Sequence, residues 1–225
     1  MNYIKPDFQA SALVIIDVQN DYTLDGAPAK IEGTLSVLPA IASLLDAYRQ
    51  AQLPIVHVVR LYRPDGSNVD ACRRAAVESG VRVVTPGSAG SQIPDDLRSP
   101  GMPDLDHQLL LSGEVQKVTD TEVVIYKPRW GAFYQTRLHE HLNGLGIDTL
   151  TFCGCNFPNC PRASIYEASE RDYRLVLAVD AISQIYDRGL AELKAIGVQL
   201  MKTEDIRAAL RADRPVQRTP LRGTA

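Results

Sequence analysis

The chain has 225 residues, a length that is too great for a disulfide-stapled miniprotein and fits one domain of ordinary size. Its 24 basic and 27 acidic residues leave a net charge of -3, which argues against a nucleic-acid binder or a basic membrane-surface protein. The hydrophobic content of 45% is typical of a globular protein. We expect a single domain over residues 1–212, followed by a polar tail over residues 213–225.

The sequence shows no sign of export or membrane insertion. Its first ten residues lack the apolar region of a secretory signal, and no run approaches the roughly 18 apolar residues of a membrane span. We therefore expect a soluble cytoplasmic protein with reduced cysteines. Of its four cysteines, Cys72 stands alone, whereas Cys153, Cys155 and Cys160 lie close together.

Short apolar runs alternate with amphipathic segments along nearly the whole chain. The predicted strands are Ala12–Asp17, Ile55–Val59, Val123–Tyr126, Thr149–Cys153, Leu175–Val179 and Val198–Met201. The predicted helices are Leu35–Gln50, Val69–Glu78, Gln135–Leu145, Pro161–Glu170, Gly189–Ile196 and Glu204–Ala212. This alternation predicts an α/β fold, a doubly wound, Rossmann-like three-layer sandwich with a mainly parallel sheet of about six strands. In such sheets, ligands bind beyond the carboxyl ends of the strands.

One connection, residues 85–121, is long and rich in Pro and Gly. Loops of this length are commonly lids or binding loops, so a lid is one interpretation and a surface excursion without function is the other.

Polar residues stand directly after two predicted strands. Asp17 closes the first strand, where a buried carboxylate is costly unless it is paired or functional, although Asp also commonly caps a turn. Lys127 follows the third strand, as an ion-pair partner or as a side chain that reaches solvent. Trp130 and Phe133 come next and are candidates for an aromatic wall or for ordinary core.

The segment from Cys153 to Cys160 runs from a strand through a Gly/Asn/Pro turn into a predicted helix. Pro161 suits the first turn of that helix, which places Cys160 at or beside its N-cap. There the free N–H groups and the helix dipole favour a thiolate and can bind an oxyanion. The alternative is a buried structural cysteine.

The remaining residues favour neither a metal nor a histidine base. The cysteine spacing lacks a second pair of ligands, His57 lies inside a strand, and His139 and His141 point to different sides of a helix. We therefore expect no metal or other cofactor. Asp17 with Lys127 is then the available pair to act as the base for a cysteine nucleophile.

Together these segments resemble the isochorismatase-like family of cysteine hydrolases (Asp-Lys-Cys amidohydrolases). The resemblance rests on Asp17-Val-Gln-Asn-Asp-Tyr22, Lys127-Pro-Arg-Trp-Gly-Ala-Phe133 and Gly154-Cys-Asn-Phe-Pro-Asn-Cys160, in this order, with further matches at Pro86-Gly87, Gln92-Ile93-Pro94 and Val179-Asp180-Ala181.

The resemblance implies a catalytic triad of Asp17, Lys127 and Cys160. Asp17 would be the general base, Lys127 its ion-pair partner, and Cys160 the nucleophile that forms a thioester. It also implies a cis peptide at Cys155–Asn156 and an oxyanion hole formed by the backbone amides of Asn156 and Cys160.

Three comparisons with members of the family refine this expectation. Relatives that bind zinc use an Asp/His/His set, but the corresponding stretch here, residues 60–66, has no histidine. Relatives that cleave the vinyl ether of isochorismate lack the cysteine. The turn also contains Phe157 and Pro158, which we expect to narrow or reshape the pocket.

The sequence thus predicts a metal-independent cysteine amidohydrolase that cleaves a C–N bond of a small amide, ureide, carbamoyl compound or lactam. The alternatives are an inactive binding or scaffold member of the fold, and a redox protein with a Cys155–Cys160 disulfide. We expect a small-molecule substrate, a homodimer or homotetramer, and neither nucleic-acid nor membrane partners. The candidate substrate-binding residues are Tyr22, Tyr62, Arg63, Trp130, Phe157 and Arg162.

Overall fold

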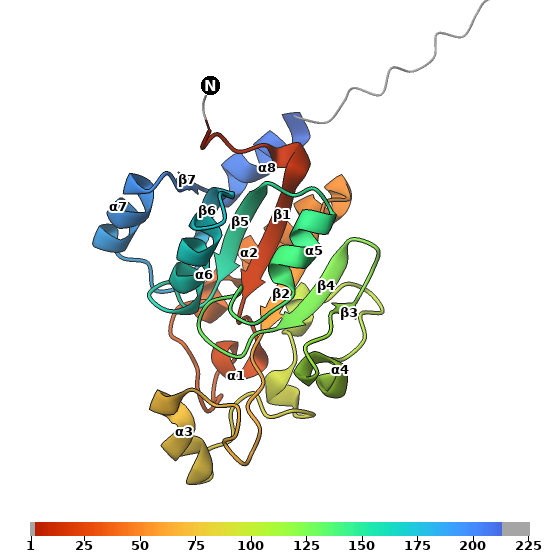
Figure 1. The fold of residues 1–225 in the computed structure, drawn as a ribbon, viewed down its shortest axis with the longest axis vertical. Coiled ribbons are helices and arrows are strands. Elements are labelled where there is room, and N and C mark those ends of the chain that lie inside the picture. The colour runs from red at the N-terminus through yellow and green to blue at the C-terminus, as the bar shows by residue number, and fades with distance from the viewer. Residues whose placement is uncertain (1–2, 213–225) are drawn as a thin grey trace, which may run out of the picture.

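Seven strands form one sheet in the computed structural model of the chain, which describes residues 3–212 (Figure 1). The order across the sheet is β3-β4-β2-β1-β5-β6-β7, and all neighbouring strands pair in parallel except the short β3, which is antiparallel to β4. The strands are β1 (Ser11–Ile16), β2 (Ile55–Val59), β3 (Gln116–Lys117), β4 (Glu122–Tyr126), β5 (Thr149–Gly154), β6 (Arg174–Ile182) and β7 (Gln199–Met201).

The predicted α/β fold and its mainly parallel sheet are confirmed, and each of the six predicted strands is present. The seventh strand, β3, escaped prediction because two residues are too few to show an alternating pattern. The predicted tail, residues 213–225, lies outside the described residues.

Helices connect the strands and cover both faces of the sheet (Figure 1). The α-helices are α1 (Asn20–Thr23), α2 (Thr34–Ala51), α3 (Ala71–Glu78), α4 (His107–Leu111), α5 (Leu138–Gly144), α6 (Cys160–Ser169), α7 (Asp187–Ala195) and α8 (Thr203–Ala212). Three short 3₁₀ helices complete the set: η1 (Phe8–Ala10), η2 (Ala89–Ser91) and η3 (Asp95–Leu97).

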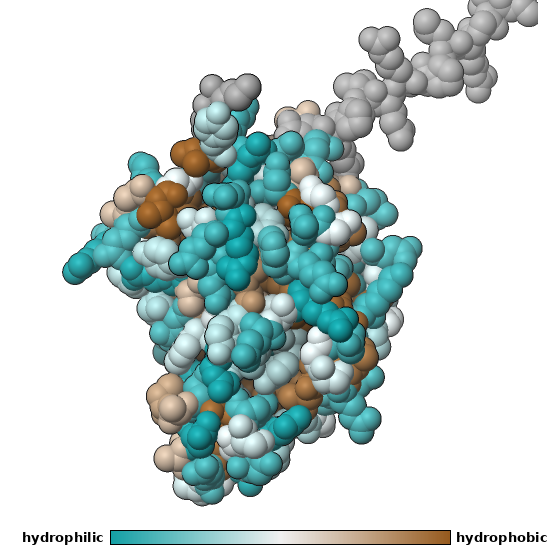
Figure 2. Space-filling view, in the orientation of Figure 1, coloured by the Kyte–Doolittle hydropathy of each residue, from teal (hydrophilic) through white to brown (hydrophobic). Residues whose placement is uncertain are grey.

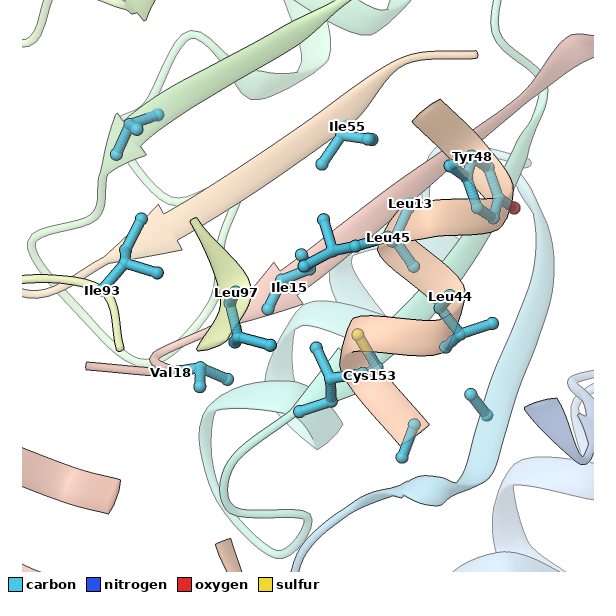
Figure 3. Packing of buried hydrophobic residues seen from close by; sticks show 14 of the residues in the cluster. Leu13, Ile15, Val18, Leu44, Leu45, Tyr48, Ile55, Ile93, Leu97 and Cys153 are labelled. Atoms are coloured by element: carbon cyan, nitrogen blue, oxygen red, sulfur yellow. The ribbon is translucent and has the colours of Figure 1, made fainter. Parts of the chain in front are cut away.

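One face of the sheet is covered by α2 and α8. The buried residues of α2 recur at helical spacing, and Leu44, Leu45 and Tyr48 pack over Leu13 of β1 and its neighbours (Figure 3). The opposite face is covered by α5, α6 and α7, whose buried apolar side chains form a second core cluster with the other side of the same strands. Because both faces are covered, the central strands consist almost entirely of buried residues.

The long connection, residues 85–121, contains η2, η3, α4 and β3 and packs against the first of these cores. Ile93 and Leu97 are buried in this cluster (Figure 3), and Met102, Leu105 and Leu110 belong to it as well. The segment therefore contributes buried side chains to the core. Its action as a lid stays a prediction.

The strand order places a topological switch point beside β1. The chain leaves β1 for β2 on one side, whereas β5 joins β1 on the other side. The loops that follow β1 and β5 therefore diverge at the carboxyl edge of the sheet, near α1 and α3 (Figure 1). This crevice is where doubly wound sheets bind their ligands.

The surface is hydrophilic over most of the face in Figure 2, where apolar residues form separate small groups. Among residues 3–212, no helix combines the length and the apolar composition needed to cross a bilayer. The expected homodimer or homotetramer stays a prediction.

A buried ionic network ties β4 to β2 and α2. Glu122 accepts hydrogen bonds from His57 Nε2 at 2.7 Å and from Arg49 at 2.8 and 3.0 Å. Burial alone would raise the pKa of Glu122, but these partners outweigh it and lower the pKa to about 2. The carboxylate therefore stabilises the folded chain at neutral pH, above its unfolded pKa of 4.5, and loses this effect as the pH falls toward 2.

We predict that Glu122→Gln lowers the free energy of unfolding by about 3 kcal/mol at pH 7, because it leaves a buried network without its anion. Urea unfolding at pH 7 and at pH 3 checks this, and the difference from the wild type should shrink at the lower pH. The control is Glu114→Gln, which removes a carboxylate from an exposed pair with Arg137 and should change stability by less than about 1 kcal/mol. Equal losses for both variants would contradict the prediction.

Candidate active site

Asp17, Lys127 and Cys160 come from three different connections at the carboxyl edge of the sheet. Asp17 directly follows β1, Lys127 directly follows β4, and Cys160 is the first residue of α6 after the β5 turn. The amide of Asp17 donates to Val58 O and that of Lys127 to Val59 O, so β2 holds both residues in register. Parallel pairing thus converts three distant positions into one site.

Lys127 and Asp17 form a buried ion pair. Lys127 Nζ lies 2.8 Å from Asp17 Oδ2, and the two side chains are 0% and 5% exposed. Lys127 Nζ also donates to the carbonyl of Arg129 at 3.2 Å. Burying two charges costs several kcal/mol per ion, so such a pair is poor evidence for stability and a reasonable marker of function.

Cys160 is nearly buried, with 5% of the residue exposed, and its thiol is protonated at neutral pH. Burial and the charge of Asp17 raise the pKa of Cys160 to about 11, although Lys127 and Arg60 act in the opposite direction. The effect expected of the helix start, which favours a thiolate, is thus opposed by burial and by Asp17. Since the hydrogen bond with Asp17 also raises the pKa, Asp17 is placed to receive the proton.

The turn before Cys160 depends on close approach of two backbones. Gly154 has φ of +116°, and a Cβ there would lie 2.3 Å from the carbonyl oxygen of Ile16, so only glycine fits. The Cys155–Asn156 peptide that follows is cis, as expected. Cys155 Sγ donates to the carbonyl of Asp17 at 3.1 Å, and Asp17 itself has φ of +55°. The turn between Gly154 and Cys160 is thus held against Asp17.

Gln19 and Asp21, from the Asp17–Tyr22 segment, form hydrogen bonds that hold the neighbouring loops. Gln19 is fully buried, and its side-chain amide donates to the carbonyls of Arg60 and Ser91 and accepts from the amide of Arg60. Asp21 accepts a hydrogen bond from the amide of Val84 at 2.6 Å. These side chains join the loops after β1 and β2 to the long connection, a positioning role that the sequence analysis did not assign.

Arg60 is the main residue that the sequence analysis missed. It directly follows β2, is 1% exposed, and places Nη2 3.1 Å from Asp70 Oδ2. Its Nη1 donates to the carbonyl of Pro128 at 2.7 Å. The signal that was available was its position after a buried strand, the same signal that identified Asp17 and Lys127.

Three of the candidate substrate-binding residues gather around Arg60. Tyr62 and Trp130 have ring centroids 5.6 and 5.9 Å from the guanidinium carbon of Arg60, and Trp130 also stacks on Arg73 at 4.7 Å. Tyr62 donates its hydroxyl proton to Asp70 and accepts from Arg73. Tyr22 is buried in the same small cluster as Tyr62 and Cys155.

The other three candidate substrate-binding residues make no hydrogen bond, ion pair or ring contact with the side chains around Arg60 in the described part of the chain. Phe157 is 0% exposed and packs edge-on against Tyr186, which is 37% exposed, so its expected effect on the pocket stays a prediction. Its ring occupies the space that a Cβ at Gly189 would need. Arg162 pairs with Glu192 and Tyr186, which binds α6 to α7, and Arg63 is exposed.

The donors beside this site do not suit a divalent cation. In the stretch after β2, the buried side chains of Arg60 and Tyr62 lie against each other, and a guanidinium and a phenol are not the usual ligands of zinc. Within residues 3–212, no group of three or more His, Cys, Asp or Glu side chains is arranged to hold a metal ion.

We predict that alkylation of Cys160 by iodoacetamide accelerates with pH up to a midpoint near 11 in a Cys72→Ser background. Asp17→Asn should lower this midpoint, because the carboxylate charge and hydrogen bond both raise the pKa of the thiol. Asp120→Asn, at an exposed carboxylate paired with Lys117, should leave it unchanged. A wild-type rate already constant between pH 6 and 8 would show a resting thiolate and contradict the prediction.

Comparisons with known proteins agree with this architecture. The model of the Isochorismatase domain family matches residues 11–205. A solved isochorismatase family protein from Desulfovibrio vulgaris is 30% identical and has a TM-score of 0.76, covering 90% of this chain and 98% of its own. A probable inactive nicotinamidase of Arabidopsis thaliana is 28% identical, over 84% of this chain and 90% of its own length.

A ureidoacrylate amidohydrolase of Methylobacterium radiotolerans is 29% identical, over 76% of this chain and 66% of its own length. The family model spans most of the chain, and the structural match covers 90% of it. The chain therefore belongs to the isochorismatase family.

Proposed function

We propose that this protein is a cysteine amidohydrolase that cleaves a C–N bond of a small amide, ureide, carbamoyl compound or lactam without a metal. The observation that carries the proposal is the buried Asp17–Lys127 pair beside a cysteine at the start of a helix. Relatives named as amidohydrolases support the reaction class.

The first half-reaction follows from the position of Asp17. Asp17 takes the thiol proton as Cys160 Sγ attacks the carbonyl carbon, and Lys127 holds the Asp17 side chain in place through their ion pair. The electron pair of the carbonyl π bond moves onto the oxygen, which becomes an oxyanion. When this intermediate collapses, the C–N bond breaks, the nitrogen takes the proton from Asp17, and an acyl thioester remains on Cys160.

The second half-reaction returns the enzyme to its resting state. Asp17 takes a proton from water, the hydroxide attacks the thioester carbonyl, and the C–S bond breaks. Cys160 regains its proton from Asp17, and the carboxylic acid product leaves. A thiol with a high resting pKa suits this cycle, because the proton moves only when substrate is in place.

The backbone amides of Asn156 and Cys160 are suited to the oxyanion. Neither of them donates any of the turn and loop backbone hydrogen bonds found in the described part of the chain. Cys160 opens α6, where amides have no acceptor within the helix. Two free amides next to the nucleophile would stabilise the developing charge by several kcal/mol.

One relative's name supports the competing idea of an inactive binding protein, since it is described as a probable inactive nicotinamidase. The presence of Asp17, Lys127 and Cys160 in one site favours activity. A redox role through Cys155 and Cys160 has less support, because the four cysteines are free and Cys155 is bonded to Asp17 O.

We predict that purified protein releases ammonia or an amine from at least one member of a panel of small amides, ureides, carbamoyl compounds and lactams. On that substrate, Cys160→Ala should lower kcat/KM by about 10⁴-fold or more, since the nucleophile is lost. Asp17→Asn should cause a comparable loss, because the thiol then has no base. Coupled ammonia detection and chromatography of the product measure both effects.

The matched control is Cys72→Ser, which changes an exposed cysteine on α3 and should keep wild-type kcat/KM. Full activity in Cys160→Ala would disprove the mechanism. No turnover of any panel member would favour the inactive binding protein, and a loss of two hydrogens after mild peroxide treatment, seen by non-reducing mass measurement, would favour the redox alternative.

A further inference from the structure

The segment of residues 129–133 connects the ion pair of the site to α6, the helix that begins with the proposed nucleophile. The carbonyl of Arg129 accepts a hydrogen bond at 3.2 Å from Lys127 Nζ, the same ammonium that lies 2.8 Å from Asp17 Oδ2. A displacement of the segment would draw the ammonium with it or break this bond. The backbone of residues 129–133 therefore helps to set the position of Lys127.

The other end of the segment is held by two side chains of α6. The amide of Ala132 donates to Ser164 Oγ at 3.0 Å, and the amide of Phe133 donates to Glu167 Oε2 at 2.8 Å. Both donors belong to buried residues, so the loss of either acceptor would leave an amide without a partner, which is costly. Two consecutive amides thus fix the segment to α6 at defined points.

Ser164 extends this connection to the backbone of the nucleophile itself. Its hydroxyl accepts from the amide of Ala132 and donates to the carbonyl of Cys160 at 2.7 Å, one turn earlier in the helix. A serine hydroxyl has one donor and two acceptor sites, so both bonds can exist together. Because Cys160, Ser164 and Glu167 recur at i, i+4 and i+7, they lie along one face of α6, and the segment is bonded to that face.

Gly131 provides the space in which Glu167 reaches the segment. A Cβ at this position would lie 2.1 Å from Glu167 Oε2, far inside contact distance. Just beyond the end of α6, the guanidinium of Arg171 lies 5.0 Å from the ring of Phe133 and adds a cation–π contact. The approach of the carboxylate to a bare backbone is therefore a specific contact, which a larger residue at position 131 would disturb.

We propose that Glu167 and Ser164 are positioning residues, which hold residues 129–133 against α6 and thereby keep Lys127 at a fixed distance from Cys160. The proposal rests on the proposed function, because this distance matters when Cys160 attacks and Asp17, paired with Lys127, takes its proton. Both side chains act through the backbone of the segment. Their role is to couple the loop after β4 to the helix after β5.

The pH dependence of Cys160 alkylation reports this coupling without requiring turnover. Burial and Asp17 raise the pKa of Cys160, whereas Lys127 and Arg60 lower it. If Lys127 is held less firmly, its effect on the thiol weakens and the pKa rises. The midpoint of the alkylation profile follows this pKa, whereas the rate at a single pH also depends on the access of the reagent.

In a Cys72→Ser background, we expect Glu167→Ala to raise this midpoint by about 1 pH unit, which lowers the thiolate fraction at pH 8 about tenfold. Glu167→Gln removes the charge but keeps an oxygen that accepts from the amide of Phe133, and it should restore the wild-type midpoint. Ser164→Ala should shift the midpoint in the same direction as Glu167→Ala, because it frees the amide of Ala132.

A further variant separates positioning from stability. Gly131→Ala keeps Ser164, Glu167 and every charge, and the added methyl group displaces only the end of the flexible Glu167 side chain. We expect it to raise the midpoint as Glu167→Ala does, while the free energy of unfolding in urea changes little. The control Glu170→Ala removes an exposed carboxylate at the end of the same helix and should change neither quantity.

Wild-type midpoints in both Glu167→Ala and Gly131→Ala would overturn the proposal, whatever their stability. A shift in Glu167→Ala that persists in Glu167→Gln would also overturn it, because the charge and not the hydrogen bond would then be responsible. On a substrate found in the amide panel, we expect Glu167→Ala to lower kcat about tenfold with KM changed by less than about threefold. Turnover that needs Cys160 together with unshifted midpoints would reject the coupling alone, whereas shifted midpoints without turnover would support the coupling and count against the amidohydrolase.

Discussion

The buried ion pair between Lys127 and Asp17 is the constraint around which the site is organised. Two charges that are almost wholly removed from water must remain within hydrogen-bond distance, since separating them would leave each with a large desolvation cost. The pair therefore holds the loops after β1 and β4 together across the intervening strand β2. It also places the carboxylate of Asp17, the base of the proposed reaction, beside the thiol of Cys160, whose pKa is raised by burial and by Asp17.

The turn at Gly154, which follows β5, has a similar positioning role on the other side of β1. Gly154 lets β5 approach the backbone of Ile16, and Cys155 bonds to the carbonyl of Asp17, so the proposed nucleophile and base are positioned by direct contact between the segments that carry them. The core supports both, because α2 covers one face of these strands and α6 covers the other. The chemistry thus rests on backbone geometry more than on flexible side chains.

The sequence predicted well those features that depend on local patterns. Continuous apolar runs identified six strands, since a parallel sheet covered on both faces needs buried residues at nearly every position. Position after a strand identified Asp17 and Lys127, and the Gly/Asn/Pro turn with Pro161 identified Cys160. The same rule would have singled out Arg60, which was passed over because arginine is by default a surface residue.

Features that depend on contacts between distant segments were beyond the sequence. Phe157 sits in a turn and looked available to a pocket, yet its ring fills the gap left by Gly189, thirty-two residues away. Cys160 looked like a resting thiolate, yet its burial and the neighbouring carboxylate outweigh the nearby cations. In both cases, the outcome was decided by which groups the fold brings together.

By itself, the sequence determined the order of strands and helices, the residues at the strand ends and the family to which the chain belongs, because these are written in local composition and spacing. Only the tertiary structure decided that Arg60 lies buried beside the triad with unused donors, since its partners come from the loops after other strands. Charge balance and desolvation are properties of an assembled site, and they come into being only when the chain has folded.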